Sequence, residues 1–166
     1  MNRKKNHLIG RVHRNLINSG MTVAVAESCT GGLLGAALTE RPGSSAYFLG
    51  GIQAYANSVK EELLGVGHET LLSYGAVSEE VASEMALGVQ RLTGSDWALS
   101  TTGIAGPDGG SEEKPVGTVW ISVADAAGVY SQKLLLDGDR SDVRNCTVFE
   151  ALSMLLERLS DDEDDL

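Results

Sequence analysis

Residues 23–32, VAVAESCTGG, decide how the rest of the chain is arranged. The apolar run over residues 21–26 predicts a buried strand, and the polar cluster with paired glycines predicts a tight turn into a helix over residues 30–40. This turn would present Ser28, Cys29 and Thr30 beside backbone N–H groups that lack a helical partner and therefore favour an anion or oxyanion. The alternative is purely structural, with Thr30 capping the helix and the glycines easing the turn.

Helices and strands alternate on both sides of this stretch. Their periodicity predicts helices over residues 6–18, 58–64, 69–73 and 141–159 and a longer helix opened by Ser78, with strands over residues 47–55, 97–101, 116–124 and 129–136. Residues 125–128 predict a hairpin between the last two strands, and Gly50-Gly51 inside a strand predicts a bulge or a close approach. This order predicts an α/β fold, a layered sandwich with a mixed sheet.

Length, charge and cysteine content narrow the class of protein. The 166 residues suit a single domain over residues 1–160, followed by a disordered acidic tail over residues 161–166. The tail supplies half of the net charge of −10, and the basic residues near the N-terminus follow one face of a helix, so we expect no nucleic-acid partner. No secretory signal or membrane span is recognisable, and Cys29 and Cys146 form no disulfide or metal pattern, so we expect a cytoplasmic protein with no membrane partner.

Three polar junctions follow predicted strands, at residues 27–32, 55–60 and 101–106. Ligands of open α/β sheets bind at the carboxyl ends of the strands, so these junctions could line one pocket. If Asn57 caps the next helix, Lys60 lies in its first turn, where the helix dipole and partial burial both lower the pKa of an amine. A neutral amine near Ser28 could take the hydroxyl proton, with Tyr55 as a relay. Alternatively, Lys60 pairs with a neighbouring glutamate on a solvated face and Tyr55 covers the core.

Other catalytic arrangements have less support in the sequence. Cys29 could act as a thiolate at a helix start, but the three histidines are scattered and none offers it a base. The glycine-rich residues 103–110 match neither a Rossmann nor a Walker loop. They could cradle a phosphate through backbone amides or simply form a flexible loop. No metal-ligand spacing is present, so we expect no metal site.

Eight blocks in register suggest a family. They are residues 26–32, 42–45, 47–51, 55–60, 75–78, 102–107, 114–119 and 138–140. Together they resemble the C-terminal domain of the CinA (competence-damage-inducible) family, whose active members are nicotinamide-nucleotide amidohydrolases. The resemblance implies a single three-layer α/β/α domain that converts nicotinamide mononucleotide to nicotinic acid mononucleotide and ammonia, a step of pyridine nucleotide salvage, without metal or other cofactor. It also implies the stand-alone form, because the N-terminal domain of some members, similar to molybdopterin-binding proteins, is absent from this sequence.

The resemblance also assigns roles to residues. It implies Ser28 as the nucleophile, Lys60 as its activating partner and Tyr55 as general base or relay. The implied substrate-binding residues are Thr30, Gly31, Gly32, Ser45, Thr102, Gly103 and Arg140, with phosphate contacts from the helix start at residues 30–32. Asp108 stands where relatives often have glycine.

Two other functions remain open on the sequence. One is a non-catalytic nucleotide-binding or interaction module of the same fold, and the other is an amidase acting on another small amide. Apolar side chains on the last helix could support a homo-oligomer, a dimer or higher, although packing in the core explains them equally well.

Overall fold

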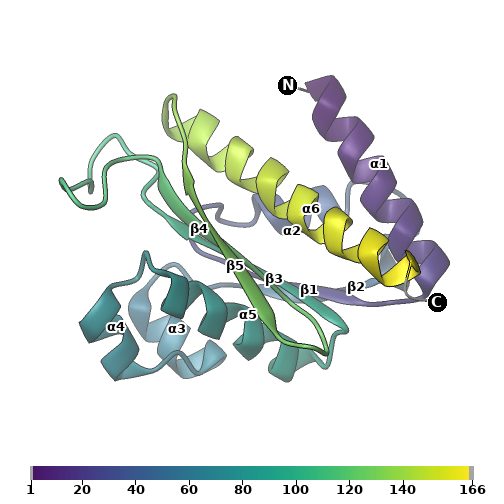
Figure 1. The fold of residues 1–166 in the computed structure, drawn as a ribbon, viewed down its shortest axis with the longest axis horizontal. Helices are drawn as coiled ribbons and strands as arrows, with labels where there is room; N and C mark the ends of the chain where they lie inside the picture. Colours follow the sequence, from purple (N-terminus) through teal and green to yellow (C-terminus); the bar gives the residue numbers. More distant parts are fainter. Residues whose placement is uncertain (1, 165–166) are drawn as a thin grey trace.

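The computed structural model describes residues 2–164, with side chains described for residues 3–160 (Figure 1). The helices and strands follow the predicted order, with a short 3-10 helix added before the second strand. Their bounds are α1 (Asn2–Ser19), β1 (Val23–Glu27), α2 (Leu33–Leu38), η1 (Ser44–Ala46), β2 (Phe48–Gln53), α3 (Asn57–Leu64), α4 (His68–Tyr74), α5 (Glu79–Thr93), β3 (Trp97–Gly103), β4 (Thr118–Ala124), β5 (Val129–Leu135) and α6 (Arg140–Asp164).

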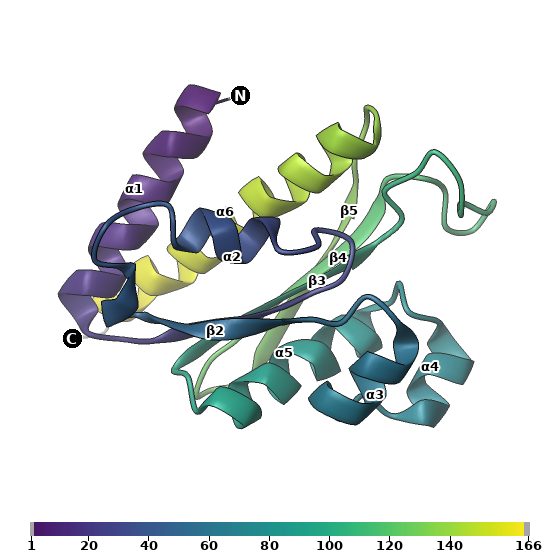
Figure 2. The same ribbon diagram turned by 180° about the vertical axis from the view of Figure 1, so that it is seen from behind.

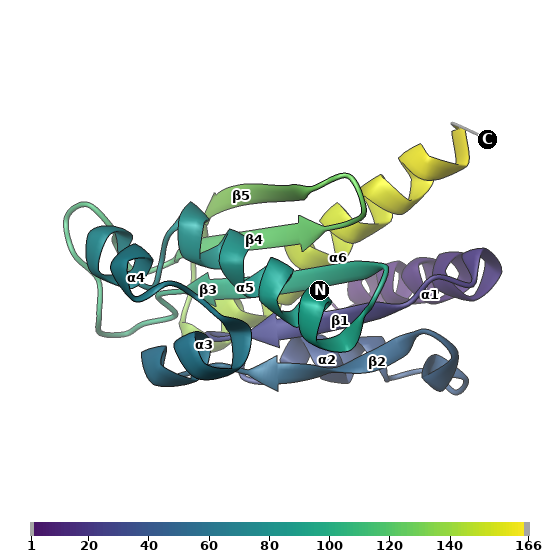
Figure 3. The same ribbon diagram turned by 90° about the horizontal axis from the view of Figure 1, so that it is seen from below.

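The strands form one mixed sheet in the order β2-β1-β3-β4-β5. The interior strand β1 is parallel to both β2 and β3, and β4 and β5 continue the sheet as an antiparallel hairpin (Figure 3). Glu27 at the end of β1 pairs with Gln53 on one side and Thr101 on the other. The three parallel strands therefore end at the same edge, where the turns that follow them can meet.

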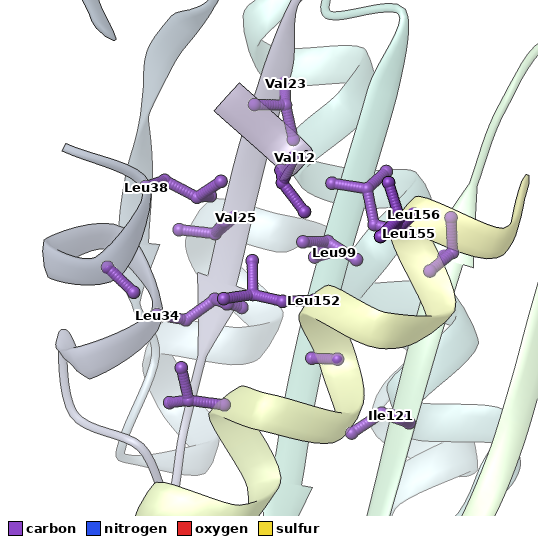
Figure 4. Close-up of a cluster of buried hydrophobic side chains, with 14 of the residues drawn as sticks. Val12, Val23, Val25, Leu34, Leu38, Leu99, Ile121, Leu152, Leu155 and Leu156 are labelled. Carbon is purple, nitrogen blue, oxygen red and sulfur yellow. The ribbon is translucent and has the colours of Figure 1, made fainter. Parts of the chain in front are cut away.

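Helices cover both faces of the sheet (Figures 1 and 2). On one face α1, α2 and α6 pack over the larger apolar cluster, which contains Val12, Leu34 and Leu152 (Figure 4). On the other face α3, α4 and α5 pack over a smaller cluster, which contains Leu64, Met85 and Val89. Because the sheet is covered twice, all five residues of β1 are buried, as expected for an interior parallel strand. The predicted three-layer α/β/α sandwich is confirmed.

The turn after β1 is longer than predicted. The sequence predicted a helix from Thr30 to Glu40, but α2 spans only Leu33–Leu38. Gly31 and Gly32 have φ angles of 55° and 102°, and this left-handed conformation cannot continue a right-handed helix. Residues 28–32 therefore form a turn of their own between β1 and α2.

The paired glycines of β2 have the predicted effect. The pairing of β1 with β2 shifts register between Val23 and Ala24, which is the signature of a bulge. A Cβ atom added to Gly51 would lie 2.5 Å from Cγ2 of Val25, so a side chain has no room there. The glycines therefore allow β2 to approach β1 closely.

The helix α6 extends to Asp164, beyond the predicted end at Leu159. It thus enters the segment 161–166, for which the sequence predicts a disordered acidic tail. That expectation stays a prediction, because the last two residues and the side chains from position 161 onward lie outside the described part. None of the described helices is long and apolar enough to cross a membrane.

The helix α3 is held in place by a glycine on its neighbour α5. A Cβ atom added to Gly88 would lie 2.0 Å from the carbonyl oxygen of Leu64, so the two helices are in backbone contact there. Lys60 lies one turn before Leu64 on α3. The close packing of α3 on α5 therefore sets where Lys60 is placed relative to the sheet.

Candidate active site

A cavity of about 280 Å³ lies where the parallel strands β1 and β3 end. All three predicted polar junctions contribute to its lining. The lining residues are Ser28, Cys29, Tyr55, Asn57, Lys60, Ala76, Val77, Thr102, Gly103, Ile104, Ala105, Gly106, Asp108, Gly109 and Arg140. A larger hollow between α1 and α6 shares none of these residues. Because the nucleophilic and basic side chains converge in the smaller cavity, we place the site there.

Ser28 and Lys60 are in direct contact in this cavity. The Lys60 Nζ atom lies 3.2 Å from the Ser28 Oγ atom and donates to the carbonyl oxygens of Ala54 (2.7 Å) and Tyr55 (3.1 Å). Lys60 is only 1% exposed, and within the described part of the chain it forms no ion pair with a glutamate. The alternative of a solvated Lys60 is therefore wrong.

Burial and hydrogen bonds both affect how Lys60 could act on the serine. Burial lowers the pKa of Lys60 from its ordinary value of 10.5. A neutral amine has two N–H groups and one lone pair, and the two carbonyl groups occupy the two N–H groups. In that neutral form the lone pair is left to accept a hydrogen bond from the Ser28 hydroxyl, which lies 3.2 Å away. This is the arrangement that a serine nucleophile and its base require.

The backbone around Ser28 is anchored from two directions. Its N–H group donates to the carbonyl oxygen of Thr101 on β3 (2.9 Å). From α6, Arg144 donates through Nε to the carbonyl of Cys29 (3.0 Å) and through Nη2 to that of Thr30 (3.1 Å). The sequence analysis missed Arg144, because nothing local in the chain shows that α6 passes over this turn.

Glu27 binds the start of α2 and thereby holds the turn. Its carboxylate is 2% exposed and accepts from the backbone N–H groups of Leu34 (2.8 Å) and Gly35 (3.1 Å) and from the Thr30 hydroxyl (2.6 Å). The Thr30 hydroxyl also lies 2.7 Å from Oγ1 of Thr101. An internal carboxylate thus takes the position that we predicted for a phosphate or an oxyanion.

This arrangement corrects the assignment of residues 30–32 to the substrate. Thr30 is buried and hydrogen-bonded to Glu27, and neither it nor Gly31 and Gly32 line the cavity. Arg144 lies beside Gly31, and the Gln53 side chain lies beside Gly32. Their role in the structure is to shape the turn that carries Ser28.

Removal of the Glu27 carboxylate should destabilise the protein. Replacing Glu27 with alanine leaves two buried N–H groups and a hydroxyl without their acceptor, and we expect a loss of about 3 kcal/mol in the free energy of unfolding. Urea denaturation followed by circular dichroism measures it. Glu40, exposed beyond the end of α2, offers the control, since Glu40→Ala should change stability by less than about 0.5 kcal/mol. Equal losses in the two variants would contradict the anchoring role.

Tyr55 contacts Lys60 through its backbone and not through its hydroxyl. Its backbone carbonyl accepts from Lys60, but its side chain is 64% exposed and its hydroxyl accepts from Nη2 of Arg140 (3.2 Å). Arg140 also donates through Nη1 to the carbonyl of Gly106 (2.8 Å). The Tyr55 hydroxyl has no hydrogen bond to Ser28 or Lys60 in the described part of the chain, so its role as a relay stays a prediction. Tyr55 and Arg140 form part of the cavity lining together.

Of the remaining predicted residues, two line the cavity and one lies at the opposite end of the strands. Thr102 and Gly103 line the cavity, and the Thr102 hydroxyl donates to the carbonyl of Ala76 (2.8 Å). Ser45 lies in η1, ahead of β2, whose first residue Phe48 pairs with Val23 at the start of β1. The structure therefore places Ser45 at the opposite edge of the sheet and does not bring it to the cavity.

Cys29 lines the cavity but is unsuited to be the nucleophile. Burial raises the pKa of its thiol to about 12, so the thiolate is not formed near neutral pH. The other candidate nucleophile, Ser28, is the residue that contacts Lys60. Five residues after β3 also line the cavity, and phosphate binding by their backbone stays a prediction; they are Ile104, Ala105, Gly106, Asp108 and Gly109.

Comparisons with a family model and with the sequences of known proteins point to the same family. A model of the CinA C-terminal domain matches residues 5–159. CinA-like proteins of Synechocystis (55% identical) and Geotalea uraniireducens (52% identical) match 84% and 85% of this chain, respectively. The chain spans 34% of the length of each of these relatives.

Solved structures match along nearly their whole length. The competence/damage inducible protein CihA from Agrobacterium tumefaciens is 42% identical with a TM-score of 0.91, and the match covers 95% of this chain and 96% of that one. A CinA superfamily protein from Klebsiella pneumoniae is 36% identical with a TM-score of 0.90, covering 94% and 98% of the two chains.

Proposed function

The chain belongs to the CinA C-terminal domain family, and from this premise we propose that it is a serine amidohydrolase that converts nicotinamide mononucleotide to nicotinic acid mononucleotide and ammonia. The names of the relatives state no reaction, so the proposal rests on the chemistry of the cavity. The observation that carries it is the 3.2 Å contact between Ser28 Oγ and a buried Lys60 Nζ whose two N–H groups are already engaged.

The first half of the reaction forms an ester with the enzyme. Lys60 accepts the hydroxyl proton of Ser28, and Oγ attacks the carbonyl carbon of the amide to give a tetrahedral oxyanion. The backbone N–H of Cys29, which follows the nucleophile and bonds to no other backbone group in the described residues, is our candidate donor to that oxyanion. The C–N bond then breaks, the proton on Lys60 passes to the leaving nitrogen, and ammonia departs.

The second half releases the acid. Lys60, again neutral, takes a proton from a water molecule, whose oxygen attacks the ester carbonyl carbon. The bond to Oγ breaks, Ser28 recovers its proton from Lys60, and the carboxylic acid leaves. All protons are returned within the pair, so the residues of this chain complete the cycle with water as the co-reactant.

Charge in the cavity supports a phosphorylated substrate. Arg140 lines the cavity, and its hydrogen bonds go to a carbonyl and a phenol, so its positive charge is free to meet a phosphate. The exposed ring of Tyr55 lies beside it and offers a flat surface to a heterocycle. A cavity of about 280 Å³ suits a small molecule rather than a peptide or a nucleic acid.

Ammonia release from nicotinamide mononucleotide is the direct test. We expect the purified chain to produce ammonia and nicotinic acid mononucleotide in equal amounts, and to act far more slowly on free nicotinamide, which lacks the phosphate. Faster turnover of another small amide would favour the amidase alternative. Binding of the nucleotide without product after long incubation would refute the enzyme and favour the non-catalytic module.

A further inference from the structure

We propose that Asp108 selects substrates whose amide-bearing ring is a cation. The inference rests on the proposed function, and it concerns the one carboxylate among the cavity-lining residues of the described chain. Asp108 lies in the segment between β3 and β4, and its side chain is exposed. It forms no ion pair within 4 Å in the described part, where the ion pairs are His68–Glu61 and Arg158–Asp125.

The charges of the cavity lining match those of a pyridinium nucleotide. In the form that activates Ser28, Lys60 is neutral, so the lining carries one positive side chain, Arg140, and one negative side chain, Asp108. Nicotinamide mononucleotide carries a positive charge on the ring nitrogen and a negative charge on the phosphate. With the phosphate at Arg140, Asp108 is the group that can face the ring, because no other carboxylate lines the cavity.

The same carboxylate attracts ligands without a net charge on the ring less strongly. A neutral ring gains nothing from Asp108, and a pyridinium ring that also carries a carboxylate has no net charge, so its attraction to Asp108 is weaker. The second case describes the product, nicotinic acid mononucleotide, so Asp108 would hold the product less tightly than the substrate. Because the side chain is exposed, we expect an effect of about five-fold on affinity, the upper part of the range for solvated ion pairs.

Two ligands isolate the ring charge. Nicotinamide mononucleotide and its 1,4-dihydro form share the amide, ribose and phosphate, but the reduced ring is neutral. Dissociation constants for both, measured by calorimetry in a Ser28→Ala background, avoid turnover. The selectivity is the ratio of the constant for the reduced form to that for the oxidised form, and we expect the additional change Asp108→Asn to lower it about five-fold.

Matched variants separate charge from shape. Asp108→Glu should keep the ratio, and Glu112→Gln, an exposed change in the same segment outside the cavity lining, should leave it unaltered. Raising the salt concentration should lower the ratio in the parent but not in Asp108→Asn. An unchanged ratio in Asp108→Asn overturns the inference, as does tighter binding of both ligands by the same factor, which would place Asp108 next to the phosphate.

Failure of the proposed function gives a different result. A protein that shows the expected ratio but releases no ammonia retains the ring selectivity and loses the enzymatic assignment. A protein that releases ammonia but shows no change of ratio retains the enzymatic assignment and loses the role of Asp108. Absence of binding by both ligands in the parent refutes the inference together with the site.

Discussion

Replacing Ser28 with alanine is expected to lower kcat/KM for ammonia release by roughly 10⁴-fold or more, since loss of a nucleophile removes the covalent route entirely. The fold should remain intact, because the anchoring contacts of this turn use the backbone of Ser28, with its N–H bonded to Thr101, and the side chain of Glu27. A coupled assay for ammonia at saturating and limiting substrate measures the loss, and thermal unfolding verifies the fold.

Ser58 is the matched control for this substitution. It is an exposed serine on α3 between the lining residues Asn57 and Lys60 but outside the lining itself, so Ser58→Ala should retain the activity of the parent. Turnover in Ser28→Ala within about ten-fold of the parent would exclude Ser28 as the nucleophile. Such a result would leave Lys60 without a reaction partner in the cavity.

Replacing Lys60 with methionine is expected to lower kcat by about 10³-fold and to abolish the pH dependence that Lys60 confers. In the parent, the protonated amine cannot accept the Ser28 proton, so activity rises with pH and levels off above the pKa of Lys60. Because burial lowers that pKa from 10.5, the plateau should begin below pH 10.5. The variant should show a flat profile over the same range.

The measurement is a pH–rate profile of kcat/KM, with Lys133→Met as the control. Lys133 is exposed on β5 and outside the cavity lining, so its replacement should leave both the rate and the profile unaltered. Full activity in Lys60→Met would refute the base. A slow Lys60→Met that keeps the rising limb would show that a group other than Lys60 controls the profile.

Much of the fold follows from local pattern. The apolar run ending at Ala26, the cap at Ser78 and the hairpin at residues 125–128 each act within a few residues, so sequence reasoning identified the elements in their observed order. The start of α2 was misplaced, because Thr30 has the side chain of a cap but is bonded instead to the buried Glu27. A competing contact of that kind is invisible to helix-start patterns.

The candidate site was predictable where strand ends supplied its residues. Ser28 and Lys60 follow β1 and β2, Thr102 and Gly103 end β3, and the structure brings all four to one cavity. Arg140 reaches the cavity from the start of α6, as the resemblance implied. Ser45 was placed wrongly, because a family block does not say at which end of a strand it lies.

The sequence by itself determined the order of helices and strands and the mixed sheet, because periodicity is a local property of a chain. Strand-end polarity made Ser28 and Lys60 candidates, and the family resemblance assigned them the proposed chemistry. The tertiary structure alone decided which charged side chains contact residues 23–32. The Glu27 carboxylate accepts from the backbone at the start of α2, Arg144 donates to the carbonyls of Cys29 and Thr30, and Lys60 Nζ contacts Ser28 Oγ. Those contacts join segments far apart in the sequence, and only the packing of both helical layers on one sheet brings them within hydrogen-bond distance.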